Sequence, residues 1–370
     1  MRDVRFFGAG DVGPQRADPH SMFKHVAPML HKADLAFCQL EPVLSRRGTP
    51  LPQARLAMRA DPESANAIRQ AGFHIVSFAS NHCMDWGQEA FCDTLDTLSG
   101  QGLAVIGAGR NLAEASKITV RECLGTRIAF LGYNSILPQG YWGTNERPGC
   151  APLRAHTVYE QIEYDQPGTP CRIHTFPHRG DLTTMCESIR QAREQADVVI
   201  LSFHWGLHFV PATLADYQRE IAHAAIDAGA DLILGHHAHI LKGIEVYRGK
   251  VIFYSLGNFA LESPFAFAEN LADKPTHKEL STLYAKMPGP STPPMSADSL
   301  KTILVDCLIA GGAIKSVFVR PVWINALSEP EMLQPDEPRH QEVVDYLIEI
   351  TRSQGLNAMF KWVDEHVAVE

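Results

Sequence analysis

The sequence predicts an α/β fold with mixed sheets. Several short runs are almost entirely apolar, as expected for strands that are buried on both faces of a sheet. These runs are residues 4–10, 35–40, 74–80, 103–109, 127–133, 197–203, 231–235 and 251–257. Segments with helical periodicity lie between several of the runs, and such alternation places helices on the outside of a sheet.

Local signals support the other elements. A helix is expected over 61–72, from Asp61 to a glycine stop, and another over 214–229. Glycine-containing turns predict two hairpins, one near Arg248-Gly249 and one near Gly311-Gly312. We therefore expect one catalytic domain over 1–330. Residues 331–370 are expected to form a helical extension packed on it, with one helix from about Pro338 and a second after Gly355.

Two segments within this domain lack periodicity, namely 134–180 and 262–298. Long loops in a compact enzyme often form lids or walls of the substrate site, although exposed linkers are the alternative. We therefore expect Trp142 and Arg179 to contact the substrate.

Composition excludes several classes of protein. The 370 residues are 45% hydrophobic with a formal charge of -9 and no Lys/Arg-rich block, which argues against a nucleic-acid partner. The first residues contain no signal-peptide core, and no apolar run is long enough to span a membrane. With eight scattered cysteines and no C-x-x-C pair, these features predict a cytoplasmic protein with no membrane partner. The oligomeric state is not predictable.

Polar side chains follow six of the apolar runs at the point where each run ends. They are Asp11, Glu41, Asn81 with His82, His204, His237 with His239, and Asn258. Because ligands bind at the carboxyl ends of strands in α/β sheets, this repetition predicts one convergent site. Each histidine taken singly is more often structural. Asn258 is expected to contact the substrate, although it is equally well explained as part of a turn.

The side-chain types indicate a metal site. Carboxylate, amide and imidazole ligands suit Mn, Fe or Zn, as one or two ions. A metal centre of this kind activates water and stabilises charge on the group under attack. His82 is placed to act as a general acid or base toward the substrate.

Six motifs, "GDVG", "QLE", "SNHCMDWG", "FHWG", "GHHAH" and "YSLGNF", resemble those of the bacterial capsule-synthesis CapA (poly-γ-glutamate synthesis) family. That family belongs to the calcineurin-like metallophosphoesterase superfamily, and the resemblance implies a four-layer αββα sandwich. By this resemblance Asp11 and His239 bind a first metal, Glu41 bridges, Asn81, His204 and His237 bind a second metal, and His82 faces the substrate. Asp85 either orients His82 or caps the helix that begins near Gln88. His236 is expected to pack behind the ligands.

Three positions depart from the family pattern. Gly13 replaces a histidine ligand of the first metal, which predicts weaker metal binding at that position. His208 stands where the family commonly has Glu, and Lys242 where it commonly has Gln. These changes favour an anionic substrate bound by Lys242, with a surface lysine as the alternative reading, and they make His208 a second catalytic candidate.

The predicted function is metal-dependent hydrolysis of a phosphoester or amide bond in a small or peptide-like anionic substrate, using metal-activated water. The first alternative is an epimerase, isomerase or lyase in which histidines such as His82 and His208 move a proton beside a metal-bound carboxylate or carbonyl. The second alternative is a binding protein with a vestigial metal site.

Overall fold

The chain folds around two mixed β-sheets that pack face to face. This description comes from a computed structural model, which describes residues 2–263, 278–279, 297–363 and 366–370. The larger sheet has ten strands, eight of which follow one path. In order they are β21 (Phe360–Val363), β22 (His366–Val369), β19 (Ala313–Ile324), β18 (Lys301–Ala310), β1 (Val4–Gly13), β2 (Leu35–Leu40), β5 (Ile75–Ser77) and β6 (Ala104–Ile106). In addition, β17 (Asn258–Leu261) pairs with β1, and β20 (Pro330–Met332) pairs with β19.

The smaller sheet has six strands. In order they are β15 (Ile244–Tyr247), β16 (Lys250–Phe253), β14 (Leu232–His236), β13 (Val198–His204), β9 (Thr126–Asn134) and β8 (Thr119–Cys123). Its four central strands are parallel, and β8 and β15 are antiparallel edge strands. The first sheet also combines parallel pairs, such as β1 with β2, and antiparallel pairs, such as β1 with β18. Both sheets are therefore mixed, as the sequence predicts.

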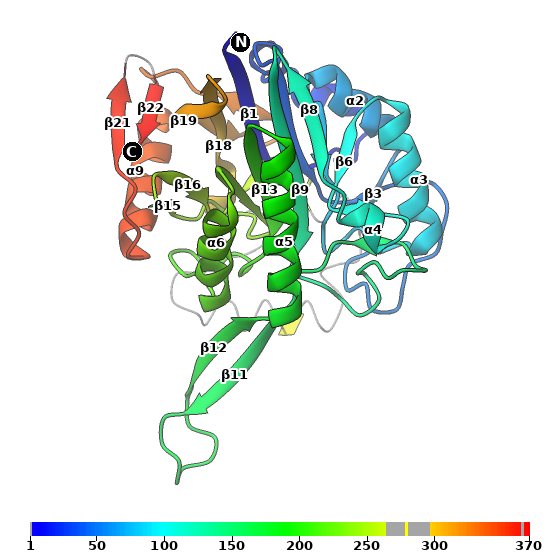
Figure 1. Cartoon of the computed structure of the whole chain (residues 1–370), viewed down its shortest axis with the longest axis vertical. Coiled ribbons are helices and arrows are strands. Elements are labelled where there is room, and N and C mark those ends of the chain that lie inside the picture. The colour runs from blue at the N-terminus through cyan, green and yellow to red at the C-terminus, as the bar shows by residue number, and fades with distance from the viewer. Residues whose placement is uncertain (1, 264–277, 280–296, 364–365) are drawn as a thin grey trace.

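Helices cover the outer face of each sheet (Figure 1). The larger sheet is covered by α1 (Ala27–Leu30), α2 (Glu63–Ala71) and α3 (Gly87–Gly100), and the smaller by α5 (Arg179–Gln195) and α6 (Asp216–Ala228). Alternation along β1 separates the layers, because Phe7 packs toward the first group of helices and Phe6 packs between the sheets. The three apolar clusters thus separate four layers, which confirms the αββα arrangement.

The predicted helix ends are close to those observed. Helix α2 is followed by Gly72 and α6 by Gly229, and these glycines have φ angles of 114° and 121°. This backbone region is open to glycine without the steric cost that a Cβ imposes. The hairpins β15–β16 and β18–β19 also form as predicted.

Two predictions about segments were wrong. The stretch 134–180 contains a hairpin, β11 (Ala155–Gln161) with β12 (Cys171–Pro177), which extends from the body (Figure 1). Both of its faces are largely exposed, so its strands lack the alternation that burial of one face imposes. At the C-terminus, α9 (Pro338–Ser353) forms as expected, but β21 and β22 replace the second helix and join the larger sheet.

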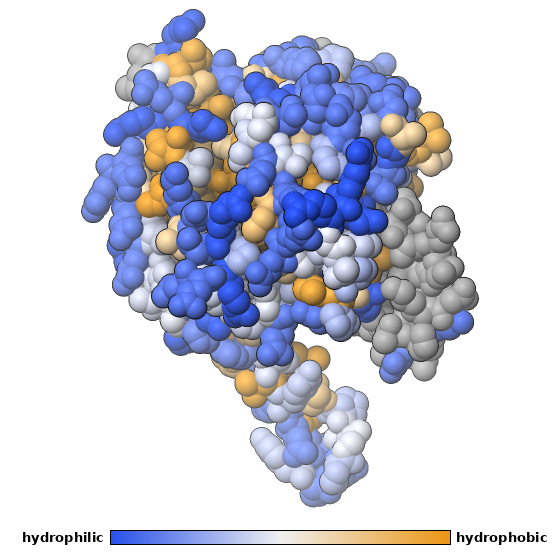
Figure 2. Space-filling model, turned by 90° about the vertical axis from the view of Figure 1, so that its right-hand side faces the viewer, coloured by the Kyte–Doolittle hydropathy of each residue, from blue (hydrophilic) through white to orange (hydrophobic). Residues whose placement is uncertain are grey.

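Most of the second aperiodic stretch, 262–298, lies outside the described residues. Figure 2 shows the side of the molecule that carries α2 and α3, with the β11–β12 hairpin projecting below the body. No helix among the described residues is both long and apolar enough to cross a membrane.

Candidate metal centre

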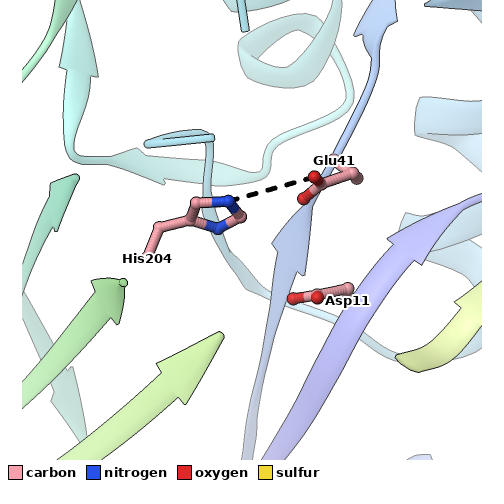
Figure 3. A group of neighbouring side chains, drawn as sticks. All are labelled: Asp11, Glu41 and His204. Carbon is pink, nitrogen blue, oxygen red and sulfur yellow. Dashed lines mark ion pairs between the residues drawn. The ribbon is translucent and has the colours of Figure 1, made fainter. Parts of the chain in front are cut away.

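Parallel strands of both sheets deliver polar side chains to one place between the sheets. Asp11 lies near the end of β1, Glu41 follows β2, and Asn81 lies in the turns after β5. His204 is the last residue of β13, and it pairs in register with His236, the last residue of β14. The predicted convergence of strand ends is therefore present in the fold (Figure 3).

Three of the candidate ligands form a tight triangle. Asn81 Oδ1 lies 2.7 Å from His204 Nε2 and 3.1 Å from His237 Nδ1, and the two nitrogens are 3.2 Å apart. Atoms bound at about 2.1 Å to one metal ion lie roughly 3 to 3.5 Å from one another. The triangle therefore has the dimensions of three ligands that share one ion.

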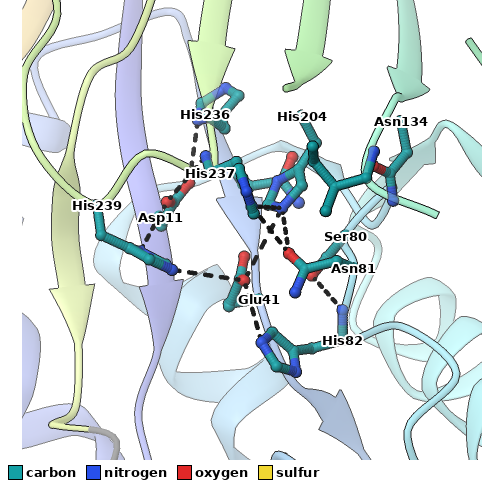
Figure 4. A network of polar contacts seen from close by, with 12 residues as sticks. Asp11, Glu41, Ser80, Asn81, His82, Asn134, His204, His236, His237 and His239 are labelled. Carbon is teal, nitrogen blue, oxygen red and sulfur yellow. Dashed lines mark hydrogen bonds and ion pairs between the residues drawn. The ribbon is translucent and has the colours of Figure 1, made fainter. Parts of the chain in front are cut away.

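Glu41 lies at the centre of the histidine cluster (Figure 4). Its Oε1 atom is 3.9 Å from Nε2 of His82, His204 and His239, which is too long for a hydrogen bond. Both carboxylate oxygens are buried without a hydrogen-bond partner among the described residues. Such an uncompensated buried carboxylate is expected where a cation belongs.

Asp11 occupies the side of the site opposite Asn81 (Figure 4). Its two oxygens lie 3.2 Å from His236 Nδ1 and 3.3 Å from His239 Nδ1. Burial tends to raise the pKa of Asp11, but the contacts to both imidazoles outweigh burial and hold the pKa below its usual range. His236 is fully buried against Phe37, with ring centroids 5.7 Å apart, in agreement with a packing role behind the ligands.

The electrostatics of the cluster suit metal binding. Burial lowers the pKa of both His204 and His237 well below the usual value, so both rings are neutral and offer lone pairs. Burial, followed by the charge of Asp11, raises the pKa of Glu41 to about 7. A divalent cation between the two carboxylates would relieve their mutual repulsion.

The backbone at the histidine cluster is strained. His237 and His239 have φ angles of 85° and 57°, in the left-handed region that side chains with a Cβ rarely adopt. Strain of this kind persists where the surrounding structure fixes it, and it occurs often at functional sites.

The surroundings of Gly13 leave no room for a side chain. A Cβ on Gly13 would lie 2.7 Å from Leu261 Cδ1 and 2.8 Å from Pro42 Cδ. The histidine that Gly13 replaces in the superfamily pattern therefore has no room here. Asn258 lies nearby instead, paired in register with Asp11, and its Oδ1 atom is 2.8 Å from His239 Nδ1.

His82 is held by a chain of hydrogen bonds. Its Nδ1 atom lies 2.6 Å from Asp85 Oδ2, and the other oxygen of Asp85 accepts a bond of 2.8 Å from the Tyr141 hydroxyl. The backbone N–H of Met58 also donates to Asp85. Burial tends to lower the pKa of His82, but Asp85 outweighs burial and raises the pKa above its usual value. The alternative role of Asp85 as a helix cap is wrong, since Trp86 occupies that position before α3.

Sequence reasoning missed the role of Tyr141. Tyr141 lies in the aperiodic stretch 134–180, but its side chain is fully buried and donates to Asp85. No local signal pairs Tyr141 with a residue 56 positions earlier, because the contact exists only in the folded chain.

His208 lies against the candidate ligands. Its ring centroid is 3.8 Å from that of His237, with an angle of 28° between the rings, and 5.2 Å from that of His239. Burial, followed by the positive charges of His239 and Arg55, lowers the pKa of His208 well below its usual value. The structure thus brings His208 to the site and indicates a cation, Arg55, near it.

Four residues predicted to contact the substrate have protein partners in the structure. Asn258 is buried and contacts His239, so it positions that ring. Arg179 is exposed on the outer helical layer and pairs with Glu220 of α6. Trp142 packs under the guanidinium of Arg154, 5.7 Å from the ring centroid. Lys242 is only 2% exposed and points away from solvent.

The Lys242 ammonium donates to the backbone carbonyls of Val210 and Thr213, the latter at 2.9 Å. These carbonyls belong to the segment that carries His208. Lys242 therefore connects this segment by hydrogen bonds to the end of the histidine cluster. Its buried position differs both from the predicted substrate contact and from the alternative of a surface lysine.

Replacing Lys242 by methionine is expected to loosen the segment that carries His208. Two backbone carbonyls would lose their charged donor, at a cost of about 1–3 kcal/mol of stability. We expect faster amide hydrogen exchange across 206–214 with unchanged metal content. Lys117→Met, at an exposed lysine, is the control. Weaker binding of an anionic substrate with unchanged stability and exchange would restore the substrate-contact role.

Comparisons with known proteins find a matching family model and several relatives. The family model described as "Bacterial capsule synthesis protein PGA_cap" matches residues 6–263. The PGA biosynthesis protein CapA of Bacillus subtilis (strain 168) is 32% identical over 244 residues, which cover 65% of this chain and 57% of that protein. The capsule biosynthesis protein CapA of Bacillus anthracis is 30% identical, covering 65% of this chain and 54% of that protein. The chain thus spans a little over half the length of these relatives.

A structural neighbour is also found. It is a hypothetical protein from Thermus thermophilus with 16% identity and a TM-score of 0.44, covering 86% of this chain and 98% of that one.

Proposed function

Because this chain belongs to the PGA_cap family of bacterial capsule synthesis proteins, we propose that it is a metal-dependent hydrolase acting on a phosphoester or amide bond of an anionic substrate. The observation that carries the proposal is the arrangement around Glu41. Three imidazole nitrogens lie at one distance, 3.9 Å, from a buried carboxylate oxygen that has no hydrogen-bond partner among the described residues.

The proposed ligands form two groups. Asn81, His204 and His237 would hold one ion, Asp11 and His239 would hold the other, and Glu41 would serve both. When bound, such ions supply a Lewis acid and lower the pKa of a water molecule. Manganese, iron and zinc all suit these nitrogen and oxygen ligands.

The residues around the ions have separate tasks. His82, whose Nδ1 faces Asp85, presents Nε2 to the centre of the site and would donate a proton to the leaving group. Asp85 and Tyr141 hold the ring in that orientation. Arg55, whose charge acts on His208, would attract a negatively charged substrate.

Metal analysis of protein purified without chelators tests the proposal. We expect two equivalents of Mn, Fe or Zn, or one equivalent if the position that lost its histidine at Gly13 binds weakly. A panel of phosphoesters and of amides of acidic compounds, assayed with and without chelator, then identifies the bond that is cleaved. If the protein binds no metal even on reconstitution, the proposal fails.

A second function is favoured by one observation, the position of His208. Its Nε2 atom is buried without a hydrogen-bond partner among the described residues, beside the ligand rings. Paired with His82, it would move a proton at a carbon next to a carboxylate, as an epimerase or lyase requires. His208→Gln is expected to abolish exchange of a substrate C–H proton with solvent if this function is right. If turnover survives the substitution unchanged, hydrolysis remains as the better account.

A further inference from the structure

A pocket of about 340 Å³ lies at the end of the larger sheet remote from the metal centre. Arg5, which lines it, stands six residues before Asp11 on β1. At about 3.3 Å per strand residue, the two positions are roughly 20 Å apart. The proposed hydrolase function makes no use of this pocket.

The pocket wall carries more positive than negative charge. Arg5 Nε and Arg320 Nε donate to the two oxygens of Asp306, at 3.1 Å and 2.7 Å. One buried carboxylate thus serves two guanidinium groups, and the Nη1 atom of each arginine makes no hydrogen bond within the described residues. Lys32 adds a third cation, with no ion pair in the described part of the chain. Among the residues that the structure describes, no acidic side chain lines the pocket, and the nearby Asp34 accepts a hydrogen bond from the backbone N–H of Arg5.

A buried histidine adds a second, independent feature. His340 lines the pocket, is only 2% exposed, and its Nδ1 atom has no hydrogen-bond partner among the described residues. Its ring stacks on Trp362 at a centroid distance of 5.1 Å, which fixes its orientation. His340 also lies in the first turn of α9, where the helix end carries partial positive charge.

The remaining wall is apolar, with Met29 and Leu333 among its residues. A bare inorganic ion would leave this surface in contact with water, whereas an organic ligand would cover it. We propose that the pocket binds a small organic anion, with a phosphate or carboxylate group held by Arg5, Lys32, Arg320 and His340 and an apolar body against Met29 and Leu333.

Equilibrium titration of the metal-loaded protein tests this site, with phenylphosphonate and benzoate as organic probes and inorganic phosphate as the bare ion. We expect at least one organic probe to bind more tightly than inorganic phosphate. Whichever of phenylphosphonate and benzoate binds more tightly identifies the preferred head group. Lys32→Glu should weaken binding roughly tenfold or more, because it replaces a charge-assisted contact by repulsion. Lys117→Glu, which changes the net charge equally at another surface position, should have little effect.

Two further variants separate this pocket from the metal centre and from misfolding. His340→Phe keeps an aromatic ring against Trp362 and should weaken binding severalfold with an unchanged melting temperature. Asp11→Asn, in the metal centre, should leave binding intact. Four outcomes would each overturn the proposal. The two lysine variants could have equal effects, or binding could be lost only in Asp11→Asn. Inorganic phosphate could bind as tightly as the organic probes, or no probe could bind at about 10 mM.

Discussion

Replacing Glu41 by glutamine is expected to remove the bound metal and reduce turnover by roughly a thousandfold, since Lewis-acid stabilisation is worth several kcal/mol. The same substitution is expected to stabilise the metal-free protein. Without a cation, the fully buried Glu41 carboxylate is repelled by the negative charge of Asp11 nearby. Burial, followed by this repulsion, raises the pKa of Glu41 to about 7. Glutamine keeps the shape of the side chain and removes the charge.

The pH dependence of this effect follows from the direction of the pKa shift. Between the ordinary pKa of 4.5 and about 7, folded metal-free protein retains a proton on Glu41 that the unfolded chain has released. Stability therefore falls as pH rises through this window, by about 3 kcal/mol in total. Glu41→Gln should abolish this part of the pH dependence, so its advantage over the wild type should be present at pH 8 and small at pH 5.

Thermal unfolding in chelator at both pH values, together with elemental analysis, measures these effects. Asp11→Asn is the matched control, because contacts to His236 and His239 hold the pKa of Asp11 low. The Asp11→Asn substitution should also remove the metal, but it should destabilise the metal-free protein. A Glu41→Gln protein that retains two equivalents of metal, or gains no stability at pH 8, would contradict the proposed place of Glu41 between the ions.

The sequence was sufficient to predict most of the strands and the convergence of their ends. A run of apolar residues indicates a buried strand, and a polar residue at the end of the run indicates the edge of the sheet. Both signals can be found in a short stretch of sequence. His204 and His237 were found in this way, although 33 positions separate them. The β11–β12 hairpin was missed because its two exposed faces leave no alternation to detect.

The errors at the site have a common physical cause. Lys242 follows the histidine cluster closely in sequence, and its role depends on carbonyls at 210 and 213 that only the folded chain brings to it. The same holds for Tyr141 beneath Asp85. Residue type and spacing indicate which side chains are candidate metal ligands, but they do not indicate which partners bury or orient the residues around them.

Replacing His82 by glutamine is expected to lower kcat for an unactivated substrate by about 10²–10⁴-fold while metal content remains unchanged. His82 is not one of the proposed ligands, and its Nε2 atom lies 3.9 Å from the Glu41 carboxylate at the centre of the site. Burial tends to lower the pKa of His82, but Asp85 outweighs burial and raises it, which favours the protonated ring that donates a proton.

The dependence on the leaving group distinguishes proton donation from a structural role. A nitrophenolate leaving group needs no proton, so His82→Gln should cost little with a nitrophenyl ester and much with an alkyl ester of the same acid. Asp85→Asn should show the same pattern at roughly 10–100-fold, since it disturbs only the orientation and charge of the ring. Equal losses with both esters would indicate that His82 maintains the metal centre, and no loss with either would show that His82 takes no part in the reaction.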